Sequence, residues 1–206
     1  MNFAHRPTKI LVTGTSGSGK TTYFITYLQR SEYRWKWVFD HEGEFAIKLR
    51  LHPARQVQEL AQRIGEPILL FDPSTMFPGR LEAGFRFWCE WCVEVARRLP
   101  GKKLMACDEL QKLVDPKQSC WELNLAMETG RRLELDAMVI SQQPNLIHNR
   151  TRNQMTEVVS FRQVDKNAID FLQSSGFREE DLQQLKPGHY RVRNLTNGAE
   201  ASGRVF

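Results

Sequence analysis

Short apolar runs alternate with longer amphipathic stretches along most of the chain. Runs with the length of buried strands cover residues 9–13, 35–40, 67–71, 103–107, 137–141, 157–162 and 190–194. Stretches with apolar residues at helical spacing cover residues 20–30, 53–65, 85–99, 121–133 and 165–174. Strands that alternate with helices predict a mostly parallel sheet, flanked by helices in right-handed crossovers. Ligands bind such sheets beyond the carboxyl ends of the strands.

Proline and glycine mark the breaks between these elements. Residues 72–84 contain two prolines and two glycines, which predicts a loop. The helix that follows is expected to end at Pro100-Gly101. The run 190–194 is expected to be the final strand. Residues 190–206 are expected to complete the sheet edge or to pack on a neighbouring molecule, and the sequence does not decide between these two outcomes.

Length and composition suit a single α/β domain over residues 1–206, with its core over about 8–190. The chain has 206 residues, of which 41% are hydrophobic and 26% are charged. Its formal net charge of +5 permits a polyanionic partner but does not require one. No apolar run approaches the ~20 residues that span a bilayer, and the N-terminus lacks a signal-peptide pattern. We therefore expect a soluble intracellular protein without a transmembrane segment.

Four cysteines raise the question of zinc or redox chemistry. Cys89 and Cys92 form a C-x-x-C pair, and the others are Cys107 and Cys120. A structural zinc site needs four ligands, and no second pair of suitable spacing is present. The C-x-x-C pair also lies in a predicted helix, so we interpret these residues as buried free thiols.

The segment GTSGSGKT matches the phosphate-loop pattern G-x-x-x-x-G-K-[ST] at every fixed position. It follows a predicted strand and opens a predicted helix, as this motif requires, so a Gly/Ser-rich surface loop is the weaker interpretation. Backbone N–H groups and the helix N-terminus would bind phosphates, Lys20 would reach the β and γ phosphates, and the Thr21 hydroxyl would coordinate Mg²⁺. The residues assigned to ATP are Gly14, Thr15, Ser16, Gly17, Ser18, Gly19, Lys20, Thr21 and Thr22.

Two carboxylates follow the apolar run that ends at Cys107. Asp108 is predicted to hold Mg²⁺ through water, and Glu109 to polarise the water that attacks the γ phosphate. The alternative is an acidic helix N-terminus, which is common because carboxylates favour that end of the helix dipole. The phosphate loop upstream favours the catalytic interpretation.

A third group of polar residues, which we call the third polar station, is Gln142 and Gln143, directly after the run 137–141. Gln142, ahead of Gln143, is predicted to hydrogen-bond the attacking water or a γ-phosphate oxygen. The alternative is a turn with exposed amides. Arg131 and Arg132 close the preceding helix, where arginine favours the helix dipole but can also reach a neighbouring subunit's γ phosphate.

The order of these motifs resembles the HerA/FtsK superfamily of ATPases that pump nucleic acid. The phosphate loop is followed by VFDHEGEFA, LMACDE, a GRR element and VISQQP. The family's second strand often ends in a D-P-x-G-E-like element, and here Asp40 and Gly43-Glu44 match it, with His41 at the usual proline. Within the superfamily, the short chain is most similar to the genome-packaging ATPases of tailless, membrane-containing double-stranded DNA viruses of the tectivirus type.

This resemblance implies a three-layer P-loop NTPase fold of the RecA/FtsK type, with ATP and Mg²⁺ as cofactors. It also implies a homo-oligomeric ring that packages viral double-stranded DNA, with Arg131 or Arg132 acting on the neighbouring subunit. A capsid or membrane vertex protein would anchor the ring. The protein would then be found in the host cytoplasm or at the packaging vertex of the virion.

The basic segment His148, Arg150 and Arg152 is one candidate for contacts with the DNA backbone, since it follows the third polar station. A solvated surface is the alternative, because most charge clusters are solvated.

Three other functions fit parts of the sequence. A related ATPase for export of filamentous phage or conjugative DNA shares the motifs but usually carries a transmembrane segment. A small-molecule kinase shares the phosphate loop, yet Asp108-Glu109 and the glutamine-ended strand favour water as the acceptor. A nucleotide switch without turnover would not need Glu109.

Overall fold

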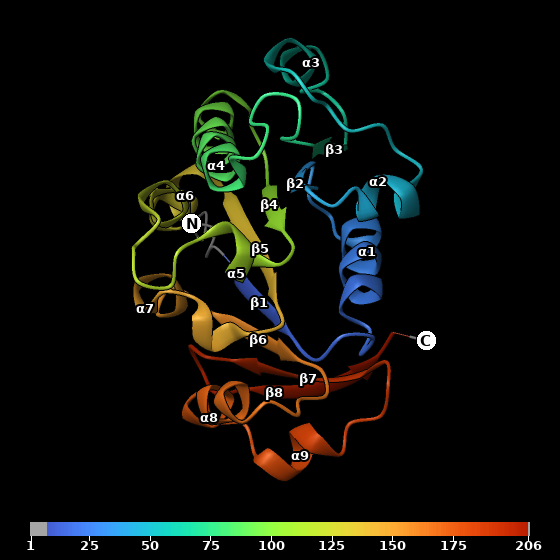
Figure 1. Ribbon diagram of the computed structural model, residues 1–206, viewed down its shortest axis with the longest axis vertical. Coiled ribbons are helices and arrows are strands. Elements are labelled where there is room, and N and C mark those ends of the chain that lie inside the picture. The colour runs from blue at the N-terminus through green and yellow to red at the C-terminus, as the bar shows by residue number, and fades with distance from the viewer. Residues whose placement is uncertain (1–7, 206) are drawn as a thin grey trace, which may run out of the picture. The chain divides into compact units, whose positions relative to one another are not determined.

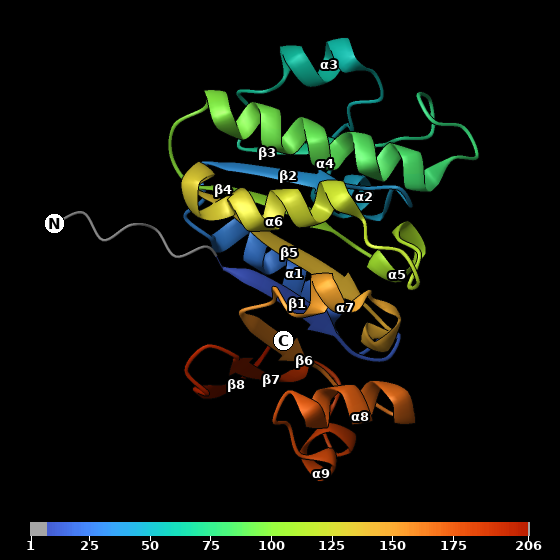
Figure 2. The ribbon, with the colours of Figure 1, turned by 90° about the vertical axis from the view of Figure 1, so that its left-hand side faces the viewer.

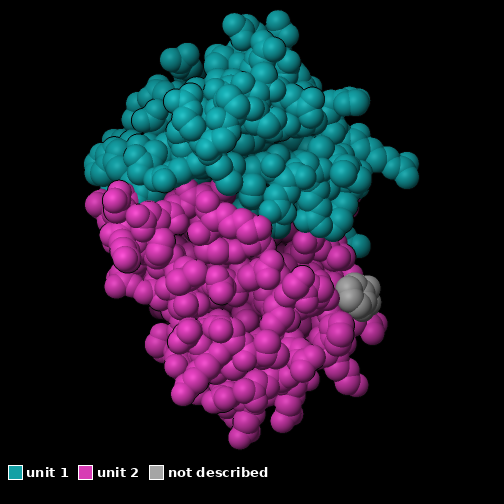
Figure 3. All heavy atoms as spheres, in the orientation of Figure 1, with its two compact units in different colours: residues 1–7, 30–108, 120–138 teal, residues 8–29, 109–119, 139–206 magenta. Residues whose placement is uncertain are grey.

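The computed structural model describes residues 8–205 of the chain (Figure 1). Its strands follow the order β3-β2-β4-β5-β1-β6-β7-β8. The described residues fall into two compact units (Figure 3), residues 30–108 with 120–138 and residues 8–29 with 109–119 and 139–205. The predicted α/β fold class, a mostly parallel sheet with flanking helices, is confirmed.

The first unit contains three parallel strands and the two longest helices of the described chain. β2 (Trp35–Phe39) pairs in parallel with β3 (Ile68–Phe71) and with β4 (Lys103–Cys107). Helices α4 (Leu81–Arg98) and α6 (Trp121–Leu133) lie side by side in Figure 2 and pack against each other.

Aromatic side chains fill the core of the first unit. The ring of Phe39 lies 5.3 Å from the ring of Phe85 and 5.6 Å from that of Trp88, measured between centroids. Phe71 lies 5.9 Å from Phe39, and all four residues are buried. Edge-to-face and tilted contacts at this range add to the stabilisation that burial of the rings provides.

The second unit combines a parallel and an antiparallel part. β1 (Lys9–Thr13) pairs in parallel with β6 (Glu157–Ser160), which pairs in antiparallel with β7 (His189–Asn194). β8 (Glu200–Arg204) then pairs in antiparallel with β7. β5 (Leu135–Ser141) begins in the first unit and ends in the second.

Helices α1 (Lys20–Arg30) and α8 (Lys166–Ser174) belong to the second unit. Asp165 begins α8 by accepting a hydrogen bond from the backbone N–H of Ala168. The shorter helices are α2 (Glu44–Leu49), α3 (Val57–Gln62), α5 (Leu110–Leu113), the 3₁₀ helix η1 (Pro144–Leu146), α7 (Asn149–Arg152) and α9 (Glu179–Gln183). None of the helices in the described part of the chain is both long and apolar enough to cross a membrane.

The loop predicted over residues 72–84 is too long, because α4 already begins at Leu81. Gly84 lies inside this helix, where a Cβ would come 2.8 Å from the Cβ of Pro73. The glycine therefore permits a close approach of the loop to the helix and does not mark a break. The predicted helix over 53–65 is shorter than expected, since only α3 forms within it.

The expectation that the C-terminal stretch completes the sheet edge is confirmed by β7 and β8. The expectation that residues 190–194 form the final strand is wrong. β8 reads EASGR and carries almost no apolar side chains, so hydrophobic periodicity could not reveal it.

The interpretation of the cysteines as buried free thiols is confirmed, since all four are buried and none is in a disulfide. Burial raises the pKa of Cys89, Cys92 and Cys107 well above the usual value. Burial also raises the pKa of Cys120, to about 11. The thiols are therefore protonated at neutral pH, and the thiolate is the reactive species.

We predict that an aromatic disulfide reagent at pH 8 leaves the folded protein unmodified, because both access and thiolate formation are suppressed. Four equivalents should react once the chain is unfolded in guanidinium, as measured by release of the coloured thiolate. A thiol that reacts at the rate of a free cysteine in the folded protein would contradict this description.

Candidate active site

The phosphate loop connects β1 to α1, and its backbone curls around the Lys20 side chain. Lys20 is buried, and its Nζ donates hydrogen bonds to the carbonyl oxygens of Gly14 at 2.8 Å and Thr15 at 2.9 Å. The Oγ of Ser18 is buried and has no hydrogen-bond partner among the described residues. A buried hydroxyl without a partner, in the same loop as a buried ammonium group, suits a ligand that carries oxygen acceptors.

The chain after β6 holds this loop from one side. The N–H of Thr15 donates to the carbonyl of Arg162 at 2.9 Å, and the N–H of Phe161 donates to the carbonyl of Thr13 at 2.8 Å. The Gln163 side chain, which is almost fully buried, donates to the Thr13 hydroxyl at 3.0 Å. The loop is thus anchored by residues nearly 150 positions away in sequence.

The chain before β7 holds the loop from another side. The N–H of Gly188 donates to the carbonyl of Ser18 at 2.9 Å. The packing is close enough that a Cβ on Gly14 would lie 2.6 Å from the Cβ of Phe161. Gly19 has a φ of +115°, and its Cβ would meet Phe161, Gly188 and Val205 within 3.2 Å. Both glycines are required by their surroundings as well as by a ligand.

A cavity of about 480 Å³ brings the phosphate loop together with two of the predicted polar stations. All of its lining residues belong to the second unit. The lining residues are Thr15, Ser16, Glu109, Gln111, Lys112, Gln142, Gln143, Gln163 and Asp165. The sequence did not predict Gln111, Lys112, Gln163 and Asp165, because no motif marks these residues and the fold brings them to the loop.

Glu109 is held by several groups in this cavity. The residue is only 6% exposed, and its Oε1 accepts a hydrogen bond from Nε2 of Gln142 at 2.6 Å. Its Oε2 accepts from Nε2 of Gln111 and lies 3.8 Å from Nζ of Lys112. The backbone of Glu109 is left-handed, with a φ of 50°, at the start of the four-residue helix α5. A buried carboxylate must be compensated in this way, since desolvation of an unpaired charge is costly.

The residues predicted for Mg²⁺ lie at the expected ends of their elements. Thr21 is half-buried in the first turn of α1, and Asp108 is half-buried directly after β4. Thr22 is exposed on α1. Mg²⁺ in nucleotide sites takes only one or two protein oxygen ligands, and substrate phosphates and water supply the rest. A hydroxyl and a carboxylate fit that donor set, and the assignment of these two residues stays a prediction.

Arg131 and Arg132 are exposed in the last turn of α6. They line a shallow cavity of about 490 Å³ with Glu128 and Thr129. Exposure leaves both guanidinium groups accessible to another molecule. A helix C-terminus also favours cations for dipole reasons, so both interpretations from the sequence stay open.

Asp40 has a structural role in the first unit. Its carboxylate accepts hydrogen bonds from the backbone N–H groups of Phe45 at 3.2 Å and Ala46 at 2.8 Å, which secures the start of α2. Burial raises the pKa of Asp40 above its usual value, and these hydrogen bonds offset only part of that rise. Gly43 supplies the left-handed turn between them, with a φ of 72°. The D-H-E-G-E element therefore stabilises the turn that connects β2 to α2.

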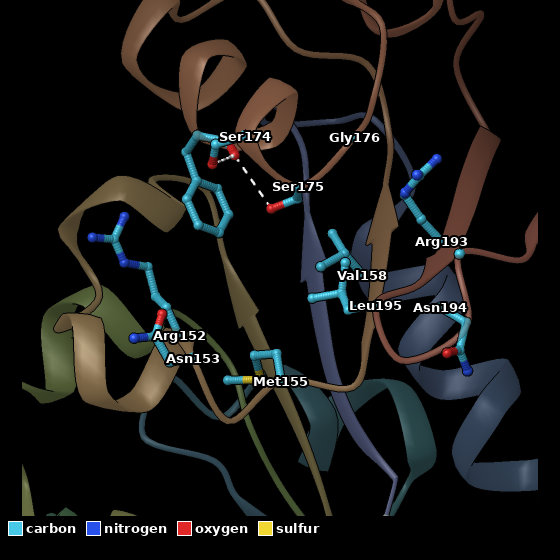
Figure 4. A pocket seen from close by; sticks show the side chains of 12 residues that line it. Arg152, Asn153, Met155, Val158, Ser174, Ser175, Gly176, Arg193, Asn194 and Leu195 are labelled. Atoms are coloured by element: carbon cyan, nitrogen blue, oxygen red, sulfur yellow. Dashed lines mark hydrogen bonds between the residues drawn. The ribbon is translucent and has the colours of Figure 1, made fainter.

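A further cavity, of about 630 Å³, shares no lining residue with the cavity beside the phosphate loop (Figure 4). Arg152 and Arg193 flank it, with Val158 and Leu195 between them in that view. The guanidinium of Arg152 lies 5.0 Å from the centroid of the Phe171 ring, and that of Arg193 pairs with a glutamate of β8. Arg152 of the predicted DNA-contact segment thus lines this cavity, whereas His148 is half-buried and Arg150 is exposed.

The chain was compared with known proteins by sequence and by structure. No family model matches the sequence, and no curated protein matches it. The genome packaging NTPase B204 from Sulfolobus turreted icosahedral virus 2, in complex with AMPPCP, is similar in structure with a TM-score of 0.69. The two sequences are 15% identical, and the match covers 96% of this chain and 97% of B204.

Two further structures share the same architecture. B204, the DNA-packaging ATPase from Sulfolobus turreted icosahedral virus, matches with a TM-score of 0.70 and 14% identity over 97% of this chain and 98% of that one. VirB4 of Thermoanaerobacter pseudethanolicus matches with a TM-score of 0.66 and 12% identity over 96% and 89%. At these identities the similarity establishes a shared fold, from end to end of the chain.

Proposed function

We propose that this protein is a Mg²⁺-dependent ATPase whose active site is the 480 Å³ cavity beside the phosphate loop. The observation that carries this proposal is the convergence of Thr15 and Ser16 with Glu109 and Gln142 around one space. A phosphate-binding loop and a buried carboxylate at the same cavity supply the two parts that nucleotide hydrolysis requires. Complexes of the structurally similar B204 with AMPPCP and with ATP-gammaS support ATP as the ligand.

The loop binds the triphosphate through its backbone and Lys20. The ammonium group of Lys20 donates to the carbonyls of Gly14 and Thr15, and a triphosphate would replace these acceptors with stronger, charged ones. The buried Ser18 hydroxyl is a further donor that needs an acceptor. The N-terminus of α1 favours negative charge at the same place.

Glu109 and Gln142 act on the water. Thr21 and Asp108 are the residues that would hold Mg²⁺, and the metal would supply positive charge against the phosphates. The Glu109 carboxylate accepts the proton from the attacking water, and the Gln142 amide orients that water. The 2.6 Å hydrogen bond between these two side chains places both groups at one point of the cavity.

We predict that Lys20→Ala lowers ATP turnover by about 100-fold or more, because an electrostatic donor to the transferred phosphoryl group is lost. Glu109→Gln should lower turnover to a similar degree while ATP still binds, because an amide cannot accept the proton from water and offers Gln111 and Gln142 only one acceptor oxygen. Phosphate release and equilibrium binding of a fluorescent ATP analogue measure the two effects. Near-normal turnover in either variant would remove that residue from its role.

We further propose that ATP hydrolysis drives the translocation of double-stranded DNA during packaging of a viral genome. End-to-end similarity to a DNA-packaging ATPase of matching length supports this proposal, and the net charge of +5 suits a polyanion. Export of filamentous phage or conjugative DNA, which the order of the motifs also fits, stays the second candidate. Attachment to a capsid or membrane vertex protein, in the host cytoplasm or the virion, follows from the packaging function.

We further propose that the protein acts as a homo-oligomeric ring, in which Arg131 or Arg132 reaches the γ phosphate bound by a neighbouring subunit. Their exposure at the end of α6 supports this role. An arginine supplied by a neighbour stabilises charge in the transition state and makes hydrolysis depend on assembly.

We expect double-stranded DNA to raise the ATPase rate of the assembled protein. The test measures the rate with and without DNA at 50 and 200 mM salt, together with the mass of the assembly. DNA affinity should fall by about 10³-fold over that range if six or more phosphates are contacted. A rate that ignores DNA but responds to a small phosphate acceptor would favour a kinase.

The neighbour's arginine can be tested by mixing two inactive variants. An Arg131→Ala/Arg132→Ala protein keeps Glu109, and a Glu109→Gln protein keeps both arginines, so a mixed ring contains some complete sites. We expect partial recovery of hydrolysis after mixing. An absence of recovery despite co-assembly, shown by mass, would exclude action between subunits.

A further inference from the structure

A side chain without a predicted role, Gln111, connects Glu109 to the end of β5. Its Nε2 donates to Oε2 of Glu109, and its Oε1 accepts a hydrogen bond from Oγ of Ser141 at 2.5 Å. Ser141 is fully buried, and its Oγ also accepts from the N–H of Gln143 at 3.2 Å. Gln142, between these two residues, donates to Oε1 of Glu109.

The direction of these hydrogen bonds determines which way the Gln111 amide faces. The N–H of Gln143 donates to Ser141 Oγ, and the Ser141 hydroxyl proton goes to Oε1 of Gln111. The amide nitrogen of Gln111 is therefore directed toward the carboxylate, where it can only donate. The Gln111 amide accepts at one end and donates at the other, a combination that neither a carboxylate nor an ammonium can provide.

The backbone alone does not fix the Glu109 carboxylate. Glu109 is in the left-handed conformation at the start of α5, and this helix has only four residues. Such a short helix is not stable by itself, so side-chain contacts must set its position. With Gln142 on Oε1 and Gln111 on Oε2, each carboxylate oxygen has an amide donor.

We propose that Gln111 is a positioning residue for hydrolysis, which holds the Glu109 carboxylate in register with Gln142 by linking both to Ser141. The proposal rests on the ATPase function proposed above. Gln111 acts through Glu109 and not on the phosphates, because the loop ligands of the triphosphate are Lys20 and the backbone of residues 14–19. Loss of the link should therefore slow the chemical step and leave ATP affinity unchanged, since misplacement by about 1 Å can cost 100-fold in rate.

The first test compares Gln111→Met with Gln118→Met. Methionine keeps the length of glutamine but removes both hydrogen-bonding ends, and Gln118 is an exposed glutamine in the segment that follows α5. For Gln111→Met we expect kcat to fall by about 10- to 100-fold, with the dissociation constant of the fluorescent ATP analogue and the melting temperature unchanged. Gln118→Met should match wild type in all three measurements. An unchanged or raised kcat in Gln111→Met would overturn the proposal, as would a fall that is matched by weaker ATP binding or lower stability.

The second test uses the dependence of the effect on Glu109 and Ser141. In a Glu109→Gln background, Gln111→Met should have no further effect on single-turnover hydrolysis, because there is no carboxylate left to position. Ser141→Ala should reproduce part of the loss, and Ser141→Ala with Gln111→Met should lose no more than Gln111→Met alone. Full additivity in either pair would overturn the link.

The two tests separate this inference from the proposed function. If wild type hydrolyses ATP and Glu109→Gln does not, the ATPase site stands, and the behaviour of Gln111→Met alone decides the inference. If wild type hydrolyses no ATP, the proposed function fails and the positioning role fails with it.

Discussion

The curled backbone of the phosphate loop depends on hydrogen bonds to chain segments that are distant in sequence. A loop rich in glycine has high conformational entropy when it is free, and its order must come from its neighbours. Here Arg162 accepts from Thr15, and Gly188 donates to Ser18. The side chain of Phe161 fills the space beneath Gly14 and Gly19. The C-terminal part of the chain, which includes the antiparallel β7 and β8, therefore supports the structure of the proposed nucleotide site.

An aromatic cluster within the second unit extends this support from the loop to α1 and β7. The ring of Tyr23 on α1 lies 5.0 Å from that of Tyr190 on β7, and 6.0 Å from that of Phe161. Burial raises the pKa of the Tyr23 hydroxyl, so the ring stays neutral at any physiological pH. The helix that follows the phosphate loop and the hairpin that supports it are thus packed on the same three rings. A shift of α1 would therefore displace the β7–β8 hairpin, and the reverse also holds, because close-packed side chains do not deform independently.

The sequence predicts the parts of the site that are local patterns. The phosphate loop, the Asp108-Glu109 pair and Gln142 each follow an apolar strand, and the order of strands and helices predicts the fold class. Gln111 and Gln163 are single polar residues without a pattern. Gln163 reaches the cavity only through the fold, and Gln111 is close to Glu109 in sequence but forms its link to Ser141 only in the fold. Gly84 was interpreted as a break because composition cannot distinguish a flexible glycine from one that permits close packing. β8 was missed because an edge strand with exposed sides needs no apolar alternation.

The network around Glu109 shows why a buried carboxylate at this place needs more than its position after a strand. The residue leaves β4 through a left-handed turn and is almost fully removed from water, so it must exchange hydration for protein donors. Two neutral amides provide these donors and add no charge that would have to move during hydrolysis. The Nζ of Lys112 lies 3.8 Å from Oε2 of Glu109 and is exposed, so solvent screens its charge and it does little to orient the carboxylate. The geometry of the carboxylate is then set by Gln142 and Gln111. Only Gln142 directly follows a strand, which is where residues of the site are usually sought.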